Sequence, residues 1–484
     1  MSGISSPSAW PSGTAIDALR RQARHELTTA LDRVPFRSVH VWILVLVASG
    51  ALFDAIEQYN VGLAAPSIAK LWHLDGTQTG LLTTLTFAGM AVGSLIAGIT
   101  GDKFGRRFTY MYNLLIFTLG ALLSAFSPDF GVLLAARLIV GLGLGGELNT
   151  GLTLVAEIMP TRGRGAAVAT VNIAAGGLGI FAASALATVI IGPLQAALGG
   201  PEGAWRWLLG LLALPALLVF VYRFFMPESP RYLLSKGKAH EANAVISRLA
   251  ANRLRAPASL RVTPYVTVPE GVSLPAERVR LTEIFSPGLA RRTVILWVVS
   301  AMTFGAQVTI TVFMPTVLVS RGFTLGSSLL YTTIIDIGGL IGAVLSSAFG
   351  YRFKRRSVLG YGSLVAILVA IGFGVSSSTA LILIFGAVLQ LMFILLNTTT
   401  WVWAPELYPT RVRAFGTGAA VTVALVAASV MPFVAGAIFD TSGTVVMFVL
   451  IAVMYAIMAV ATYFGPETHG TVLQEGETRP EADG

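Results

Sequence analysis

Gly101-Asp-Lys-Phe-Gly-Arg-Arg107 returns in altered form as Gly350-Tyr-Arg-Phe-Lys-Arg-Arg356, and this repeated stretch decides the fold. A second motif, Glu157-Ile-Met-Pro-Thr-Arg162, returns as Glu406-Leu-Tyr-Pro-Thr-Arg411. Both repeats have the same offset of 249 residues. Basic loops alone would explain the arginines, but neither the shared Glu and Pro nor the common offset. The sequence therefore predicts two copies of one structural unit.

The segments around these motifs are strongly apolar. Of the 484 residues, 55% are hydrophobic and 12% are charged, whereas a soluble domain has about 25% charged residues. A helix needs about 20 apolar residues to cross a bilayer. Twelve stretches meet this requirement, at 41–66, 78–100, 108–127, 130–156, 164–191, 203–226, 293–319, 327–349, 358–376, 380–404, 412–438 and 444–465. Because they lack the strict alternation of barrel strands, we predict an all-α membrane protein with two pseudo-symmetric six-helix halves.

The basic residues predict the orientation in the membrane. Of the 33 Lys and Arg residues, 29 lie in segments on one side, and positively charged loops stay in the cytoplasm. Both termini are therefore predicted to be cytoplasmic, and the net charge of +9 reflects topology rather than a nucleic-acid partner. The predicted divisions are a cytoplasmic N-terminal segment 1–40, an N-terminal half 41–226, a cytoplasmic linker 227–292, a C-terminal half 293–465 and a cytoplasmic tail 466–484. Residues 15–33 fit either a basic surface helix or an unstructured leader.

Duplicated halves joined by a cytoplasmic linker are typical of transporters that work by alternating access. The sequence contains no phosphate-binding loop, no His-Glu-x-x-His and no cysteine, so it predicts no enzyme, no cofactor and no metal site. Arg is in excess over Lys, and Ala and Gly are abundant. This composition indicates a GC-rich bacterium, and with it a multi-pass protein of the inner membrane.

Several motifs resemble those of a known superfamily. Gly101–Arg107 resembles the loop signature of the major facilitator superfamily. Two further motifs resemble those of the sugar-porter-like branch of this superfamily, Pro227-Glu-Ser-Pro-Arg231 and Pro405-Glu-Leu-Tyr-Pro-Thr-Arg-Val-Arg413. Three further motifs are similar to those of metabolite:proton symporters, close to niacin carriers and synaptic-vesicle-glycoprotein-like transporters: Leu31-Asp-Arg-Val-Pro-Phe36, Phe53-Asp-Ala-Ile-Glu57 and Gly145-Gly-Glu147. The resemblance extends from about residue 30 to residue 467 and implies the major facilitator fold.

This resemblance implies a monomeric secondary active transporter that is driven by the proton gradient. The first choice of solute is a monocarboxylate such as nicotinate or an aromatic acid, followed by an organic cation or drug and then by a sugar. Sugar ranks last because Phe304-Gly-Ala-Gln-Val308 and Asn172-Ile-Ala-Ala-Gly176 depart from the sugar-porter patterns. A non-transporting receptor on the same scaffold is the alternative from a different functional class.

Ionisable residues inside the predicted spans are candidates for the transport chemistry, because each costs about 2.5–3.5 kcal/mol to insert. Asp54 and Glu57 lie three residues apart on one helix face. The resemblance implies that Glu57 faces Arg137 and takes the proton, which would release Arg137. Asp54 is an alternative proton site, since two nearby acids repel each other when both are ionised. An ion pair that merely fixes two helices is the structural alternative.

Two further acids lie in the predicted spans. Glu147 is flanked by glycines and is expected either to bind a cationic group of the solute or to hold a break in the backbone. Asp336 is the only acid of the second half inside a span, because the positions that match Asp54 and Glu57 are Thr303 and Ala306. The proton chemistry is therefore expected mainly in the first half.

The candidate solute site combines aromatic walls with a few polar groups, as small-molecule sites do. Its predicted members are Tyr59, Asn172, Phe304, Gln307, Tyr331, Gln390, Asn397, Trp401 and Trp403, together with Glu147 and Asp336. Trp401 and Trp403 have a second interpretation as anchors at the membrane surface.

The loop motifs are predicted to gate the cytoplasmic side through salt bridges between helices. The resemblance assigns this role to Asp102, Arg106, Arg107, Glu157, Glu228, Arg231, Arg355, Arg356, Glu406 and Arg413. Tyr351 occupies the position that matches Asp102 of the first copy, so the two cytoplasmic gates are not expected to be equally strong.

Overall fold

The computed structural model describes residues 13–214, 221–222, 224–255, 260–268, 272–273, 279–349, 353–409 and 411–468. The helices of the first part are α1 (Gly13–Arg33), α2 (Ser38–Trp72), α3 (Gly76–Phe104), α4 (Arg106–Ala125), α5 (Phe130–Ile158), α6 (Thr161–Asn172), η1 (Ile173–Leu178), α7 (Gly179–Ile191), α8 (Gly200–Gly210) and η2 (Leu211–Ala213). Those of the linker are α10 (Pro230–Ser235), α11 (Ala239–Ala250) and η3 (Leu281–Phe285). The last part contains α12 (Ala290–Ser320), α13 (Leu325–Phe349), α14 (Arg355–Val375), α15 (Thr379–Glu406) and α16 (Arg413–Tyr463).

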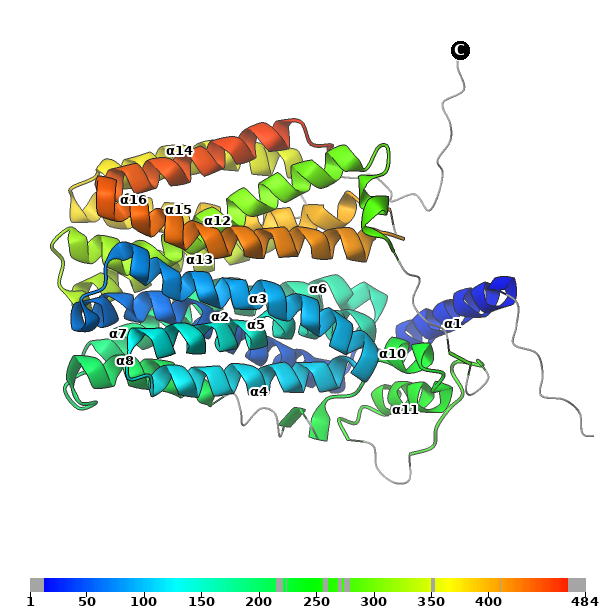
Figure 1. Ribbon diagram of the computed structural model, residues 1–484. Helices are drawn as coiled ribbons and strands as arrows, with labels where there is room; N and C mark the ends of the chain where they lie inside the picture. The colour runs from blue at the N-terminus through cyan, green and yellow to red at the C-terminus, as the bar shows by residue number, and fades with distance from the viewer. Residues whose placement is uncertain are drawn as a thin grey trace, which may run out of the picture.

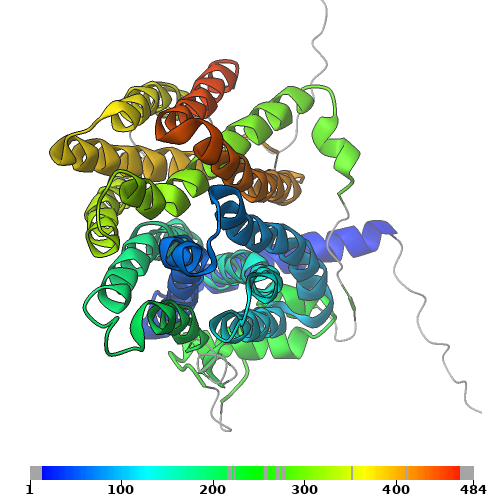
Figure 2. The same cartoon turned by 60° about the vertical axis from the view of Figure 1, so that its left-hand side comes forward.

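The membrane-spanning helices form two bundles side by side. Figures 1 and 2 show α2 to α8 in one bundle, the N-terminal half, and α12 to α16 in the other, the C-terminal half. Within the described residues, ten helical segments are long and apolar enough to cross a membrane. The chain is thus an integral membrane protein with a helical fold.

The count of twelve spans remains a prediction. α16 has 51 residues, which would make a straight helix of about 75 Å, but its backbone leaves the helical region at Gly443, where φ is 77°. It therefore holds two of the predicted stretches, 412–438 and 444–465. The stretch 203–226 includes residues 215–220 and 223, which lie outside the described part of the chain. The cytoplasmic location of the termini also remains a prediction.

Glycines bring α3 and α5 into close backbone contact. A Cβ atom at Gly141 of α5 would collide with the carbonyl oxygen of Thr86 on α3, and one at Gly145 would collide with that of Met90. Small residues at such crossings let membrane helices approach closely. This packing sets the rotation of α5 and therefore determines which helices Arg137 and Glu147 face.

The fifth span is interrupted by a turn of π-helix, which the sequence analysis did not predict. η1 (Ile173–Leu178) begins directly after Asn172 and contacts α2 in its own half and α13 in the other half. A Cβ atom at Gly177 would lie 2.6 Å from the Cβ of Ala343. π-helical turns inside α-helices occur frequently at functional sites, and this one lies where the two halves meet.

The N-terminal segment forms a docked helix, α1 (Gly13–Arg33), so the interpretation of residues 15–33 as an unstructured leader was wrong. α1 buries Ala23, Leu27 and Leu31. The Glu26 carboxylate accepts hydrogen bonds from the backbone N–H of Thr267 at 2.8 Å and from its hydroxyl at 2.9 Å. Asp32 accepts one from the N–H of Thr161, at the start of α6. In Figure 1, α1 lies with α10 and α11 at one end of the bundles. The N-terminal segment and the linker therefore pack together on the N-terminal half.

At the opposite end, a carboxylate connects the two halves. Asp440 of α16 accepts hydrogen bonds from the N–H of Gly76 and the N–H of Thr77, both at 2.8 Å, and from the Thr77 hydroxyl at 3.0 Å. These groups form the first turn of α3, where unpaired N–H groups and the helix dipole favour an anion. The distribution of Lys and Arg predicts that this end faces the outside of the cell. Asp440 therefore holds the outer ends of α3 and α16 together.

We expect Asp440→Asn to favour opening of this end. Hydrogen bonds to a charged group contribute about 1.5–3 kcal/mol, so the balance between closed and open states should change about tenfold or more. The chain contains no cysteine, so Thr79→Cys on α3, buried here, provides a single site for a membrane-impermeant maleimide. Its labelling rate should rise in the Asp440→Asn background. Asp75→Asn is the control, because Asp75 caps α3 from its own half; equal labelling in both backgrounds would refute the role of Asp440.

Candidate functional site

Glu57 and Arg137 form an ion pair inside the N-terminal half, as the sequence analysis expected. Arg137 Nη1 on α5 lies 2.5 Å from Glu57 Oε1 on α2, and both side chains are 0% exposed. Arg137 Nε also donates to the Thr86 hydroxyl at 3.2 Å. Arg137 Nη2 and Glu57 Oε2 have no hydrogen-bond partner among the described residues. The pair is therefore closed off from water but only partly satisfied.

The neighbours of Asp54 differ from the expected ones. The sequence placed Asp54 beside Glu57. In the structure, the strongest electrostatic interaction of Asp54 with another carboxylate is with Glu147 of α5, and the interaction with Glu57 is weaker. Asp54 is 8% exposed and Glu147 is fully buried. None of their four carboxylate oxygens has a hydrogen-bond partner within the described part of the chain. The N-terminal half thus contains two different acidic arrangements, Glu57 with Arg137 and Asp54 with Glu147.

Two tyrosines that the sequence analysis missed complete this cluster. The hydroxyls of Tyr110 on α4 and Tyr222 in the sixth apolar stretch lie 3.5 Å apart, and their rings meet edge to face at 5.0 Å. Tyr222 donates to the carbonyl oxygen of Leu46 at 2.5 Å. Both side chains are buried. A tyrosine inside an apolar span is a usable signal, because a buried hydroxyl usually has a hydrogen-bond partner.

Gly50 makes room for this cluster on α2. A Cβ atom at position 50 would lie 2.9 Å from Glu147 Oε1 and 3.1 Å from the Tyr222 hydroxyl, and it would collide with the Tyr110 hydroxyl. Three polar side chains from three different spans therefore converge on one glycine.

A second polar cluster crosses from one half to the other. Gln307 of α12 donates to the Tyr59 hydroxyl of α2 at 2.8 Å, and Asn397 of α15 donates to Gln307 Oε1 at 2.6 Å. Nearby on α12, Phe304 packs edge to face against Phe87 of α3 at 6.0 Å. This cluster gathers Tyr59, Phe304, Gln307 and Asn397, four of the predicted solute-site residues.

The other predicted solute-site residues lie in several places. Asp336 of α13 accepts a hydrogen bond from Gln390 of α15 at 2.8 Å, and both are buried. Tyr331 is half-buried and packs against Phe323 at 5.2 Å. Trp403 is fully buried and donates to the carbonyl oxygen of Pro466 at 3.3 Å. Its indole N–H is therefore already used by the segment after α16.

The remaining two predicted residues are half-buried, and one residue was missed. Asn172 ends α6 directly before the π-helical turn, and Trp401 lies near the end of α15. Asn60 of α2 was not predicted; it is fully buried, and neither atom of its amide has a partner among the described residues. An amide inside an apolar span is a signal that could have identified it.

The loop motifs form matching networks in the two halves. In the N-terminal half, Glu228 accepts hydrogen bonds from the N–H groups of Arg106 at 3.0 Å and Arg107 at 3.2 Å. In the C-terminal half, Glu467 accepts them from the N–H groups of Arg355 at 3.0 Å and Arg356 at 3.3 Å. Burial raises the pKa of Glu228. Each carboxylate therefore caps the helix that follows its basic loop.

Hydroxyls extend the same symmetry. Ser229 donates to Glu157 and Thr468 donates to Glu406, each at 2.5 Å. Pro466-Glu-Thr468 thus repeats Pro227-Glu-Ser229, with an offset of 239 residues instead of 249. The sequence analysis did not identify this third repeat, whose offset differs from that of the other two, and it did not name Glu467 among the predicted gate residues.

Salt bridges accompany these caps. Asp102 pairs with Arg106 at 2.7 Å, and Glu406 pairs with Arg355 at 3.2 Å. Glu157 interacts electrostatically with Arg231. Arg413 donates a hydrogen bond to the carbonyl oxygen of Tyr408 at 3.3 Å. Tyr351, predicted to weaken the second copy, lies outside the described residues. The described networks join helices within one half, whereas salt bridges that close the cytoplasmic side would have to join the halves.

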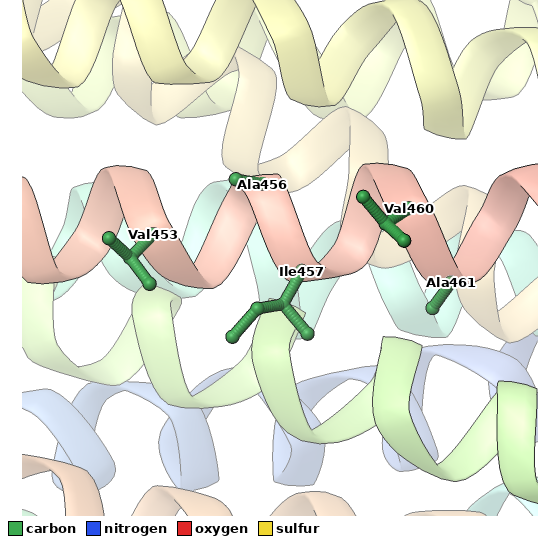
Figure 3. A pocket seen from close by; sticks show the side chains of 5 residues that line it. All are labelled: Val453, Ala456, Ile457, Val460 and Ala461. Carbon is green, nitrogen blue, oxygen red and sulfur yellow. The ribbon is translucent and has the colours of Figure 1, made fainter.

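A surface hollow on α16 has a different character. It is lined by Val453, Ala456, Ile457, Val460 and Ala461, whose side chains Figure 3 shows along one helix. These apolar side chains suit contact with lipid rather than a polar solute. We therefore locate the candidate site at the two polar clusters inside the bundles.

Comparisons with known proteins bear on the family and the fold. A family model described as "Sugar (and other) transporter" matches residues 49–479. The niacin transporter NiaP of Acinetobacter baylyi is 28% identical over 453 residues, which cover 93% of this chain and 99% of that protein. The organic cation/carnitine transporter 7 of Arabidopsis thaliana is 26% identical over 502 residues, which cover 93% and 96%. The fold is similar to that of the xylose transporter XylE from E. coli in a partially occluded inward-open conformation, with a TM-score of 0.70, 19% identity and coverage of 90% and 100%.

Proposed function

The chain belongs to the sugar (and other) transporter family of the major facilitator superfamily, and from this premise we propose that it moves a small organic solute together with protons by alternating access. Membership confirms the predicted superfamily and branch and makes the chain a solute transporter rather than an enzyme. The coupling to protons, the identity of the solute and the roles of the site residues are part of the proposal.

The buried ion pair of Glu57 and Arg137 carries the proposal of proton coupling. A proton on Glu57 would remove one charge of the pair and leave the other unpaired, which changes the energy of the site by several kcal/mol. Only two residues further along α2, Tyr59 bonds to Gln307 of the other half. The same helix thus connects the proton site to the contact between halves, and protonation can shift the balance between inward-facing and outward-facing states.

A monocarboxylate such as nicotinate or an aromatic acid is the proposed solute. Arg137 Nη2, which has no partner in the part of the chain that the structure describes, supplies a cation for a carboxylate once Glu57 is protonated. Phe87 and Phe304 supply aromatic surface for a flat ring. The similarity to a niacin transporter supports this choice. The solute would lie between Arg137 and the cluster of Tyr59, Gln307 and Asn397.

An organic cation is the second candidate, because the carboxylates of Asp54 and Glu147 have no hydrogen-bond donor among the described residues. The similarity to an organic cation/carnitine transporter supports it. Sugar ranks third, and a receptor that moves no solute is the alternative from another class.

We propose that the capped loop networks support the cytoplasmic gate from within each half. Glu228 and Glu467 would hold the helices of each half together as rigid units, so that the halves move against each other during transport. Twelve spans with cytoplasmic termini, division into halves at 41–226 and 293–465, and a monomer in a bacterial inner membrane complete the proposal.

Uptake by proteoliposomes tests the function. Purified protein is reconstituted, an acid-outside pH gradient is imposed, and labelled nicotinate, benzoate, carnitine and xylose are compared. We expect the two carboxylates to accumulate and a protonophore to abolish the accumulation. Accumulation of carnitine alone would favour the second candidate, and accumulation of xylose alone the third. Equilibration without accumulation would refute proton coupling, and the absence of any movement of the four solutes would favour the receptor.

A further inference from the structure

The proton that Glu57 would carry has no direct contact with water in this structure. The side chains of Glu57 and Arg137 are 0% exposed, and α2 continues past them for several turns towards its beginning at Ser38. A proton that leaves Glu57 in this state must therefore pass over other polar groups inside the N-terminal half.

A row of polar groups starts at Glu57 and follows one face of α2. Positions 57, 54, 50 and 46 are separated by three or four residues, the spacing of neighbours on a helix surface. Asp54 follows Glu57, and the carboxylate of Glu147 interacts with Asp54. Glu147 Oε1 lies beside Gly50, together with the hydroxyls of Tyr110 and Tyr222. Tyr222 then bonds to the carbonyl oxygen of Leu46.

The middle of this row requires a positive partner. Asp54 and Glu147 are more than nine-tenths buried, and their oxygens accept no hydrogen bond from the residues that the structure describes. Two carboxylates in such a place are stable together only with a cation or a proton between them. Arg137 is engaged with Glu57 and Thr86. The two carboxylates therefore require one positive charge between them, either a proton or a small cation.

We propose that Asp54, Glu147, Tyr110 and Tyr222 form a proton relay within the N-terminal half, separate from the path of the solute between the halves. This inference rests on the proposed proton coupling. One proton moves from Glu57 to Asp54 and is then shared with Glu147. The Tyr110 hydroxyl passes its own proton on to Tyr222 as it receives the next one from Glu147. Tyr222 in turn releases its own proton to water, a step that requires its hydrogen bond to the Leu46 carbonyl to break. No electron moves, and each acceptor gains the proton that its neighbour loses.

The position of the tyrosines gives the relay its direction. Tyr110 lies one turn into α4, which begins at Arg106, and Tyr222 lies close to the end of the sixth apolar stretch. Both hydroxyls also lie beside Gly50, which is nearer than Glu57 to the start of α2 at Ser38. This start follows α1, which lies with α10 and α11 at one end of the bundles (Figure 1). The relay thus leads from the middle of the bundle towards the side predicted to be cytoplasmic.

Infrared spectroscopy of the purified, solute-free chain in nanodiscs tests the relay. Protonated carboxyl groups have a C=O stretching band of their own, which shifts in D2O. We expect this band in the wild type, with loss or displacement in Asp54→Asn and in Glu147→Gln. Tyr110→Phe should displace it by removing the hydroxyl beside Glu147, and Gly50→Ala should do the same by pushing that hydroxyl away.

Tyr455→Phe is the matched control. Tyr455 is also a fully buried tyrosine, but it lies on α16, and its hydroxyl has no partner among the described residues. This variant should leave the band unchanged. If Glu147→Gln fails to fold, Tyr110→Phe removes only one oxygen atom and keeps the test decisive.

The rate of proton uptake distinguishes a proton relay from a proton that stays bound at one site. After a pH jump, proton uptake followed with a pH-sensitive dye should be about tenfold slower in Tyr110→Phe than in the wild type or Tyr455→Phe, because a positioned proton-transfer group contributes at least that much. Unchanged bands, or rates within about twofold of the wild type, would overturn the proposal; so would a tightly bound sodium or organic cation that replaces the band. Since no solute is used, failure of solute transport would refute the proposed function without touching this result.

Discussion

Arg137→Met is expected to lower the free energy of unfolding by about 3–5 kcal/mol, the typical effect of removing one member of a buried ion pair. Methionine keeps most of the volume of the arginine side chain, so the loss reports the uncompensated charge of Glu57 rather than a cavity. The carboxylate would keep no cationic neighbour in a place where it has no contact with water. Thermal or denaturant unfolding of the purified protein measures the effect.

Two further variants make this result specific. Lys238→Ala removes an ion pair with Glu241 whose side chains are 52% and 54% exposed, and such surface pairs contribute about 0–1 kcal/mol. The double variant Glu57→Gln with Arg137→Met removes both charges and should recover much of the loss, because neighbouring sites do not act additively. A loss in Arg137→Met no larger than that in Lys238→Ala would show that the pair does not stabilise the fold.

The sequence predicted the features that depend on local pattern. Apolar length and the repeated loop motifs led to the helical fold and the superfamily, and the scarcity of charge in the spans led to Glu57 and Arg137. The superfamily and the helical fold are confirmed, and Glu57 does pair with Arg137, whereas the role of the pair in transport stays a prediction. A charge in a membrane span has a large energetic effect, so a single residue reveals it.

The sequence did not predict which acids face each other. On α2 alone, Asp54 and Glu57 are neighbours, but the glycine contacts between α3 and α5 rotate Glu147 towards Asp54. That rotation is a property of packing between helices. Trp403 shows the same limit, because its contact with Pro466 depends on how the segment after α16 folds back.

Glu467 was missed for a different reason. The second copy of the Pro-Glu-Ser/Thr motif has shifted by ten residues relative to the other repeats, while its hydrogen bonds to Arg355 and Arg356 are retained. The structure conserves the geometry of the cap, whereas the chain reaches it with a different number of residues. The common offset of the other two motifs therefore does not lead to this repeat.

Glu57→Gln should abolish gradient-driven accumulation while solute exchange continues. A gradient of one pH unit is worth about 1.4 kcal/mol per proton, so a 1:1 symporter accumulates its solute about tenfold when the membrane potential is collapsed. Glutamine keeps the shape of the side chain but carries no proton to transport, and the accumulation ratio should fall to about one. Exchange of labelled for unlabelled solute at equal pH requires no net proton movement and should persist.

Asp129→Asn is the control for this measurement. Asp129 caps the start of α5 by accepting a hydrogen bond from the N–H of Val132 at 2.9 Å, and asparagine caps equally well, so accumulation should remain about tenfold.

Asp54→Asn distinguishes the two acids that the sequence left open as the proton site. In the relay, Asp54 passes on a proton that Glu57 has taken, so Asp54→Asn should slow accumulation and leave its final ratio near that of the wild type. If Asp54→Asn instead lowers the ratio to one and Glu57→Gln does not, Asp54 is the coupling site. If both variants keep the full ratio, neither acid couples transport to protons, and the buried pair only fixes α2 against α5.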